Sequence, residues 1–203
     1  MRIDPYNVRL SGKGGQGILL AGIILAEAGM KDGLNVAQSQ TYGPQARLGA
    51  SKSEVILSSR PIAFPEVETP NLWLCLSVEA FEKHGAAMCS GGLLLLDERV
   101  AREKGNDGAV VLPIIATAIA LGDVIAANIV ALGSMAGLTG IVTQASLEGA
   151  VAERVKISFR ELNLKALRAG YDLAEKHLIG GHGGSFPADE VGLRFSTAFD
   201  RLP

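Results

Sequence analysis

The chain has 203 residues, a formal net charge of −2 and 48% hydrophobic residues, which suits a globular domain with a real core. No run of Lys and Arg is long enough to contact several phosphates, so a nucleic-acid partner is not expected. The longest apolar run, residues 110–121, is shorter than the roughly 20 residues that span a bilayer, so no membrane association is expected either.

The first 40 residues have the pattern of a strand, a glycine turn, a helix and a second strand. Residues 8–10 are predicted to form a short strand that leads into the turn at residues 11–17. Apolar and small residues at helical spacing predict a helix over residues 18–30, and Gly33 is a plausible stop. Residues 35–38 begin the next strand. Together these elements predict a βαβ unit, and therefore a parallel sheet with a right-handed crossover.

Further strands and then helices follow along the chain. Strands are predicted at residues 53–58, 72–77, 93–97 and 109–113, and helices at residues 78–88, 125–137, 143–155 (with Thr143 as N-cap) and 159–178. This order predicts an α/β fold with a Rossmann-like, mostly parallel sheet flanked by helices and a helical C-terminal part. One domain is expected over residues 1–178, and the glycine-rich residues 179–203 are expected to be a flexible tail.

Cysteine and histidine content restricts the chemistry of the chain. Cys75 and Cys89 are the only cysteines, so neither a disulfide framework nor an iron–sulfur cluster with four thiolates is expected from this chain alone. The three histidines lack metal-ligand spacing, and no metal site is predicted. The N-terminal residues lack the apolar core of a signal peptide, so the cytoplasm is the expected compartment.

The glycine turn is a candidate anion site. Gly12, Gly14 and Gly17 satisfy G-x-G-x-x-G between a strand and a helix, where free N–H groups and the helix dipole favour an anion. A complete dinucleotide site is disfavoured because residues 36–40, after the second predicted strand begins, carry no carboxylate for a ribose. Two alternatives stay open: a bound phosphate-bearing ligand, or glycines that only allow a close turn.

The loop after the second strand is a second candidate site. Tyr42, Gly43, Pro44, Gln45 and Arg47 leave the carboxyl end of a strand, which is the edge where open parallel sheets place ligands. The Arg47 fork could grip a carboxylate or phosphate, and Tyr42 could stack or donate a hydrogen bond. A ligand-facing loop, a subunit interface and a plain surface turn remain alternatives.

Three blocks of residues resemble a known family, the gamma subunits of 2-oxoacid:ferredoxin oxidoreductases, and most closely the 2-oxoglutarate type. The blocks are Gly12-Lys13-Gly14-Gly15-Gln16-Gly17; residues 42–47 with 51–56 and Pro61-Ile62; and residues 128–133, 139–142 and 162–167 with Gly170-Tyr171. Their order along the chain, from about residue 8 to 175, makes the resemblance specific.

The resemblance implies a multisubunit enzyme, a heterotetramer with alpha, beta and delta chains, in which this chain is inactive alone. Such an enzyme oxidatively decarboxylates a 2-oxoacid, transfers the acyl group to coenzyme A and passes electrons to ferredoxin. The resemblance places thiamine diphosphate and the iron–sulfur clusters in partner subunits, with coenzyme A as co-substrate, and assigns no catalytic residue here. Gly12, Gly14, Gly15, Gln16, Gly17 and the 42–47 loop would then bind an anion or a partner. An isolated copy could form a homo-oligomer through its exposed surfaces.

Two other functions remain as alternatives: a free-standing nucleotide- or coenzyme A-binding regulatory module, and a structural scaffold whose glycine turn holds nothing. Three single residues are given structural roles. Asp97 is expected to cap a helix or turn, Asn128 to bond a backbone group, and Cys75 to be a buried core thiol.

Overall fold

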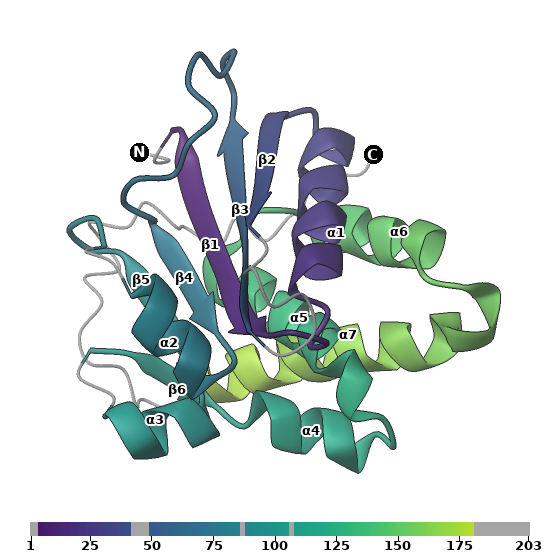
Figure 1. Ribbon diagram of the computed structural model, residues 1–203. Coiled ribbons are helices and arrows are strands. Elements are labelled where there is room, and N and C mark those ends of the chain that lie inside the picture. The colour runs from purple at the N-terminus through teal and green to yellow at the C-terminus, as the bar shows by residue number, and fades with distance from the viewer. Residues whose placement is uncertain (1–3, 42–48, 86–87, 106–107, 181–203) are drawn as a thin grey trace.

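The computed structural model describes residues 4–41, 49–85, 88–105 and 108–180. Within these ranges, six strands form one sheet between two layers of helices (Figure 1). The strands are β1 (Tyr6–Lys13), β2 (Asn35–Thr41), β3 (Ala50–Ser58), β4 (Leu72–Cys75), β5 (Leu93–Asp97) and β6 (Val110–Leu112). The helices are α1 (Ile18–Lys31), α2 (Val78–His84), α3 (Glu98–Lys104), α4 (Ile114–Ala120), the 3-10 turn η1 (Val124–Ala126), α5 (Ala127–Thr139), α6 (Gln144–Arg154) and α7 (Ile157–Ile179).

The strand order is β2-β3-β1-β4-β5-β6, and the predicted α/β class with a mostly parallel sheet is confirmed. The strands β1, β4, β5 and β6 pair in parallel. β3 pairs antiparallel with both β1 and β2. β1 and β2 therefore run in the same direction and α1 connects them, as predicted for a βαβ unit, although β3 lies between the two strands. A short connection returns the chain from β2 into β3, and an antiparallel neighbour needs no crossover helix.

The two faces of the sheet have separate cores. Alternate residues of β1 point to opposite faces, so Val8 and Leu10 belong to the larger core while Arg9 and Ser11 face the other way. The larger core joins α1, α4 and α5 to one face of the sheet, while α6 packs against α1 and α7, and α7 packs against α5 (Figure 1). The smaller core, around Trp73, lies under α2 and α3.

Helices α5 and α7 pack so closely that their backbones touch. A Cβ added to Gly133 would lie 2.1 Å from the carbonyl oxygen of Leu167, and one added to Gly170 would lie 2.1 Å from that of Val130. One turn further on, a Cβ on Gly137 would meet Ala174 at 2.8 Å. Small residues four apart on both helices therefore make this crossing possible.

Most predicted elements occur, with shifted ends. The sequence pattern missed α3 and α4, and it extended the helix after β4 to residue 88, although α2 ends at His84. The N-cap role of Thr143 is confirmed, since its hydroxyl accepts from the N–H of Ser146 at 3.3 Å. Beyond Gly180 the predicted tail lies outside the described residues. No described helix combines the length and apolar character that crossing a bilayer requires.

Candidate functional site at the carboxyl edge of the sheet

The glycine turn joins the end of β1 to the start of α1, and the side chain of Gln16 fills part of it. The Gln16 Oε1 accepts a hydrogen bond from the N–H of Lys13 at 2.6 Å. Its Nε2 donates to the carbonyl oxygen of Leu76 at 3.3 Å, just past the end of β4. Gln16 thus ties the turn to the neighbouring strand, and one of the turn's own N–H groups is used inside the chain.

Close contacts or a positive φ require glycine at three positions of the turn. A Cβ on Gly12 would lie 2.6 Å from the Gln16 Oε1 and 2.9 Å from Ile18. Gly15 has a φ of +92°, and no atom lies within 4 Å of a Cβ added there, so only its backbone conformation requires glycine. Gly17 is left-handed, with a φ of 70°, and it precedes α1 without any side-chain cap. The first turn of α1 therefore offers its N–H groups and the positive end of the helix dipole at this edge.

The start of α5 also reaches the turn. Asn128 is 3% exposed, and its Nδ2 donates to the carbonyl oxygen of Gly17 at 3.1 Å. The expected bond from Asn128 to a backbone group is therefore confirmed. This bond fixes the turn to a helix that lies more than 100 positions later in the chain.

The turn and the ends of the second candidate loop lie together. The N–H of Gly14 donates to the carbonyl oxygen of Gly49 at 2.9 Å, and Lys13 pairs with Ala50 at the start of β3. On the other side of β3, Thr41 pairs with Lys52. Tyr42, Gly43, Pro44, Gln45 and Arg47 themselves lie outside the described residues. The strands on either side therefore bring both ends of this loop to the edge that carries the glycine turn.

Asp97 ends β5 at the same edge of the sheet, where it is fully buried. One carboxylate oxygen accepts from the N–H of Arg99 at 3.0 Å and the other from the N–H of Ile115 at 2.9 Å. A single side chain thus caps the first turns of both α3 and α4, which confirms the expected capping role. Burial raises the pKa of Asp97 above its usual value, against the lowering effect of these bonds.

A buried ion pair on the opposite face was not predicted. Arg9 and Glu54 are 5% and 7% exposed, and the Arg9 Nε donates to the Glu54 Oε1 at 2.8 Å. Lys52 reaches the other oxygen at 2.9 Å, and the Arg9 Nη2 donates to the Val67 carbonyl oxygen at 3.0 Å. The sequence did offer a signal for this pair, because Arg9 and Glu54 are charged residues within two otherwise apolar strand patterns. The pair anchors the segment that follows β3.

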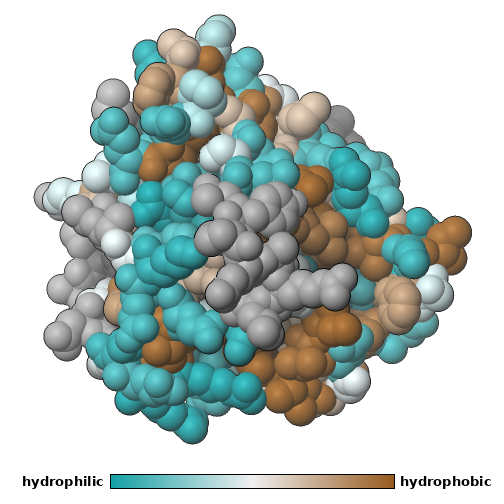
Figure 2. All heavy atoms as spheres, in the orientation of Figure 1, coloured by the Kyte–Doolittle hydropathy of each residue, from teal (hydrophilic) through white to brown (hydrophobic). Residues whose placement is uncertain are grey.

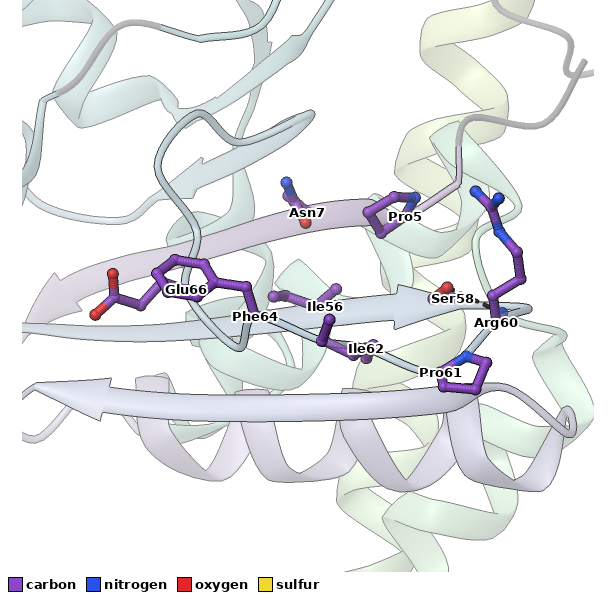
Figure 3. A pocket seen from close by; sticks show the side chains of 10 residues that line it. Pro5, Asn7, Ile56, Ser58, Arg60, Pro61, Ile62, Phe64 and Glu66 are labelled. Atoms are coloured by element: carbon purple, nitrogen blue, oxygen red, sulfur yellow. Dashed lines mark hydrogen bonds between the residues drawn. The ribbon is translucent and has the colours of Figure 1, made fainter.

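A hollow of about 360 Å³ lies at the other end of β1 from the turn (Figure 3). Its lining is Pro5, Asn7, Ile56, Ser58, Arg60, Pro61, Ile62, Ala63, Phe64 and Glu66. Arg60 supplies the positive charge among these described residues, and it is paired with Asp4. The Arg60 Nε lies 3.6 Å from the Asp4 Oδ2, and the Arg60 Nη2 donates to the Asp4 carbonyl oxygen at 3.2 Å. Because that charge is already paired, the hollow suits a phosphate ligand less well than the glycine turn does.

The fold, the turn and the loop ends can be compared with known proteins. Residues 7–173 match the family model described as pyruvate ferredoxin/flavodoxin oxidoreductase. The chain belongs to this family. It is 43% identical over 175 residues to a 2-oxoglutarate synthase subunit, KorC, of Methanocaldococcus jannaschii, a match that covers 83% of this chain and 94% of the relative.

Two solved structures share the fold. The gamma subunit of a keto/oxoacid ferredoxin oxidoreductase from Geobacter sulfurreducens superimposes with a TM-score of 0.76 at 44% identity, over 85% of this chain and 98% of that one. A 2-oxoglutarate:ferredoxin oxidoreductase from Magnetococcus marinus gives a TM-score of 0.77 at 22% identity, over 86% of this chain and 32% of that one. The second likeness concerns the fold alone.

The residues of this family member do not fit an iron–sulfur cluster. The sequence has two cysteines, whereas such clusters normally take four thiolates. Cys75 is fully buried in β4, where its thiol donates to the Ser77 carbonyl oxygen at 3.3 Å, and burial raises its pKa. This confirms the expected core role of Cys75. Within the described ranges, no three His, Cys, Asp or Glu side chains are grouped to hold a metal ion.

Proposed function

We propose that this chain is the gamma subunit of a 2-oxoacid:ferredoxin oxidoreductase that acts on 2-oxoglutarate. The enzyme would decarboxylate the 2-oxoacid oxidatively, transfer the acyl group to coenzyme A and pass the electrons to ferredoxin. The single observation that carries the proposal is the 43% identity to an archaeal 2-oxoglutarate synthase subunit over 94% of that relative's length.

The chemistry would be divided among the chains of a heterotetramer in the cytoplasm. Alpha, beta and delta subunits would hold thiamine diphosphate and the iron–sulfur clusters, since this chain has too few cysteines to ligate a cluster. Residues 1–178 would act as one domain that completes the active-site architecture. It would contribute binding surfaces rather than a reacting side chain.

The carboxyl edge would be the surface that meets coenzyme A or a partner chain. The start of α1 has no side-chain cap, and Gly14 bonds directly to Gly49 at the end of the 42–48 loop. Gly12, Gly15, Gln16 and Gly17 would shape the turn, with Gln16 acting through its bonds to the backbone. In the loop, Tyr42, Gly43, Pro44, Gln45 and Arg47 would supply the contacts to an anion or a subunit.

An exposed apolar surface supports the expectation of partner chains. Ile119, Val124 and Ile125 are 50%, 53% and 66% exposed, although apolar side chains of this size are usually buried. They lie on α4 and η1, which contact each other, and Figure 2 shows apolar atoms gathered over this region. Exposed apolar patches are typical of protein–protein interfaces, so this surface is where a partner chain would pack.

Reconstitution tests the proposed activity. The chain would be co-expressed with the candidate alpha, beta and delta subunits from the same source, and reduction of a viologen dye would be followed. We expect reduction that requires 2-oxoglutarate, coenzyme A and this chain together, and less activity with pyruvate, 2-oxoisovalerate or indolepyruvate. Full activity of the other subunits without this chain, or turnover by this chain alone, would contradict the proposal.

Arg47→Ala separates the two roles left open for the loop. If Arg47 grips coenzyme A, the complex will assemble normally and KM for coenzyme A will rise. If Arg47 faces a subunit, the complex will dissociate more readily while KM for the remaining assembled enzyme stays unchanged. Arg102→Ala is the matched control, because Arg102 is an exposed arginine on α3 that pairs with Glu98.

A further inference from the structure

We propose that the outer edge of β2 pairs with β2 of a second copy of this chain, antiparallel and about a twofold axis at Gln38. The two sheets would then become one continuous sheet, with the two α1 helices packed side by side across the axis. This pairing does not depend on the proposed enzymatic role.

The edge strand β2 lacks the features that usually protect a free sheet edge. It is seven residues long and pairs only with β3 among the described strands. Its sequence, NVAQSQT, contains neither a charged residue nor a proline. Natural edge strands are commonly short or carry Lys or Pro to prevent pairing with another chain. At the other edge, β6 has only three residues, so β2 is the edge open to pairing.

An apolar stripe on α1 runs beside this edge. Leu19, Ile23, Ala26 and Met30 recur at intervals of four, three and four residues, which places them on one flank of the helix. The sheet-facing side of α1 is marked by Gly22 and Gly29, which pack against β2 and β3.

The flank of α1 opposite the stripe is occupied. Ala21 and Ala28 are fully buried there, so the stripe lies on the β2 side of the helix. Met30, in the stripe, is 65% exposed. Figure 2 shows apolar atoms over part of α1.

The position of α1 above the sheet suits packing against its own copy. A Cβ on Gly22 would lie 2.1 Å from the Ser53 Oγ of β3 and 3.3 Å from the Gln38 Nε2 of β2, so α1 sits above the boundary of these two strands. Neighbouring strands lie about 4.8 Å apart. The boundary between β2 and β3 is half a spacing from β2 on one side, and the twofold axis is half a spacing from β2 on the other side. The distance from the boundary to the axis is therefore about 4.8 Å. The two α1 axes would be about 10 Å apart, at the upper end of the usual spacing of packed helices.

The charges of the molecule also permit self-pairing. About an axis at Gln38, Ala37 would face Ser39 of the copy and Val36 would face Gln40, so no like charges meet. The charged residues of α1 are held on its far side by α6. Lys31 pairs with Glu153 at 2.7 Å, and Glu27 is bound by Arg154. The β2 edge and the α1 stripe of one copy, both uncharged, would therefore meet the same uncharged surface of the other copy.

Light scattering on the full chain tests the pairing. We expect the wild-type chain to show about twice the 21.2 kDa of one copy, with dissociation on dilution. Ser39→Lys would place two lysines diagonally across the axis, and dimerisation should weaken about tenfold or more. Ser39→Glu should have the same effect, whereas a mixture of the two variants should restore a dimer. Met30→Lys, at the exposed end of the stripe, should also weaken dimerisation.

Ser90→Lys is the control, because it makes the same substitution at an exposed turn away from β2. Equal thermal melting of all variants would show that each one folds. A wild-type chain that stays monomeric at every concentration would overturn the proposal. So would a dimer that tolerates both Ser39→Lys and Met30→Lys. If the chain is monomeric and Ser39→Lys instead blocks assembly with other subunits, then a partner's strand occupies this edge and self-pairing is wrong.

Discussion

The Asn128 side chain and the Gly17 carbonyl oxygen form a hydrogen bond of 3.1 Å that joins the start of α5 to the glycine turn. The same closeness disfavours any side chain at position 17, because an added Cβ would lie 2.4 Å from the Asn128 Nδ2 and would displace it. Gly17 is also left-handed, with a φ of 70°. Its conformation and its neighbour thus both require glycine, independently of any ligand.

Gly17→Ala should therefore destabilise the protein by more than Gly15→Ala. Both replacements put alanine at a positive φ, which costs about 1–2 kcal/mol. Only position 17 adds a clash, because nothing lies within 4 Å of a Cβ on Gly15. Denaturant unfolding would measure both losses. In the double variant Gly17→Ala/Asn128→Ala, the clash is relieved, so the loss should be smaller than the sum of the two single losses. Strict additivity would contradict this interpretation.

Arg9→Met should cost about 3–5 kcal/mol of unfolding free energy, because it leaves the buried Glu54 carboxylate with only Lys52 as a charged partner. Replacing both residues, as Arg9→Met/Glu54→Leu, should recover much of the loss. Arg102→Met is the control, since the Arg102 side chain is 73% exposed and its pair with Glu98 should contribute less than about 1 kcal/mol. Equal losses of unfolding free energy for Arg9→Met and Arg102→Met would show that the buried pair does not anchor this part of the fold.

Gly133→Ala should destabilise the crossing of α5 and α7, by about 1–3 kcal/mol or more, because the new methyl group overlaps the Leu167 carbonyl oxygen. Gly149→Ala is the matched control in another helix. There the nearest atom to an added Cβ is the Lys31 Cδ at 3.8 Å, so alanine should stabilise α6 slightly through its better helix propensity. Thermal melting of the two variants should thus shift in opposite directions. A harmless Gly133→Ala would mean that the two helices can separate at little cost.

Asp97 should make the free energy of unfolding fall as the pH rises. An exposed, ion-paired carboxylate, whose pKa is lowered on folding, would make it rise instead. Because burial raises its pKa above the usual 3.8, the folded state binds this proton more tightly than the unfolded state does. The contribution of Asp97 is then greatest below its ordinary pKa and declines as the pH rises through the folded pKa. Unfolding free energies of the wild type and Asp97→Asn would be compared from about pH 4 to 7. The wild type minus variant difference should fall with rising pH, and a difference that grows would refute the inferred burial effect.

The sequence by itself determined the local elements and their class. The alternation of apolar runs with helical spacing predicted β1, α1, β4 and β5 because these patterns reflect burial of one or both faces of an element. Glycine spacing located the turn before α1, since positive φ and close approach leave few other residues possible. Short elements such as α3 and α4 were missed because seven residues span barely two turns and show little periodicity.

Only the tertiary structure decided how these elements combine. The insertion of β3 between β1 and β2 depends on backbone pairing, which a strand's own residues do not encode. The partner of Arg9 lies 45 positions along the chain, and that of Gly17 lies 111 positions along it. The role of Gln16 also depends on Leu76, at the end of another strand. The physical reason is common to all of these: each contact joins groups that only the assembled sheet and its helices bring within hydrogen-bonding distance.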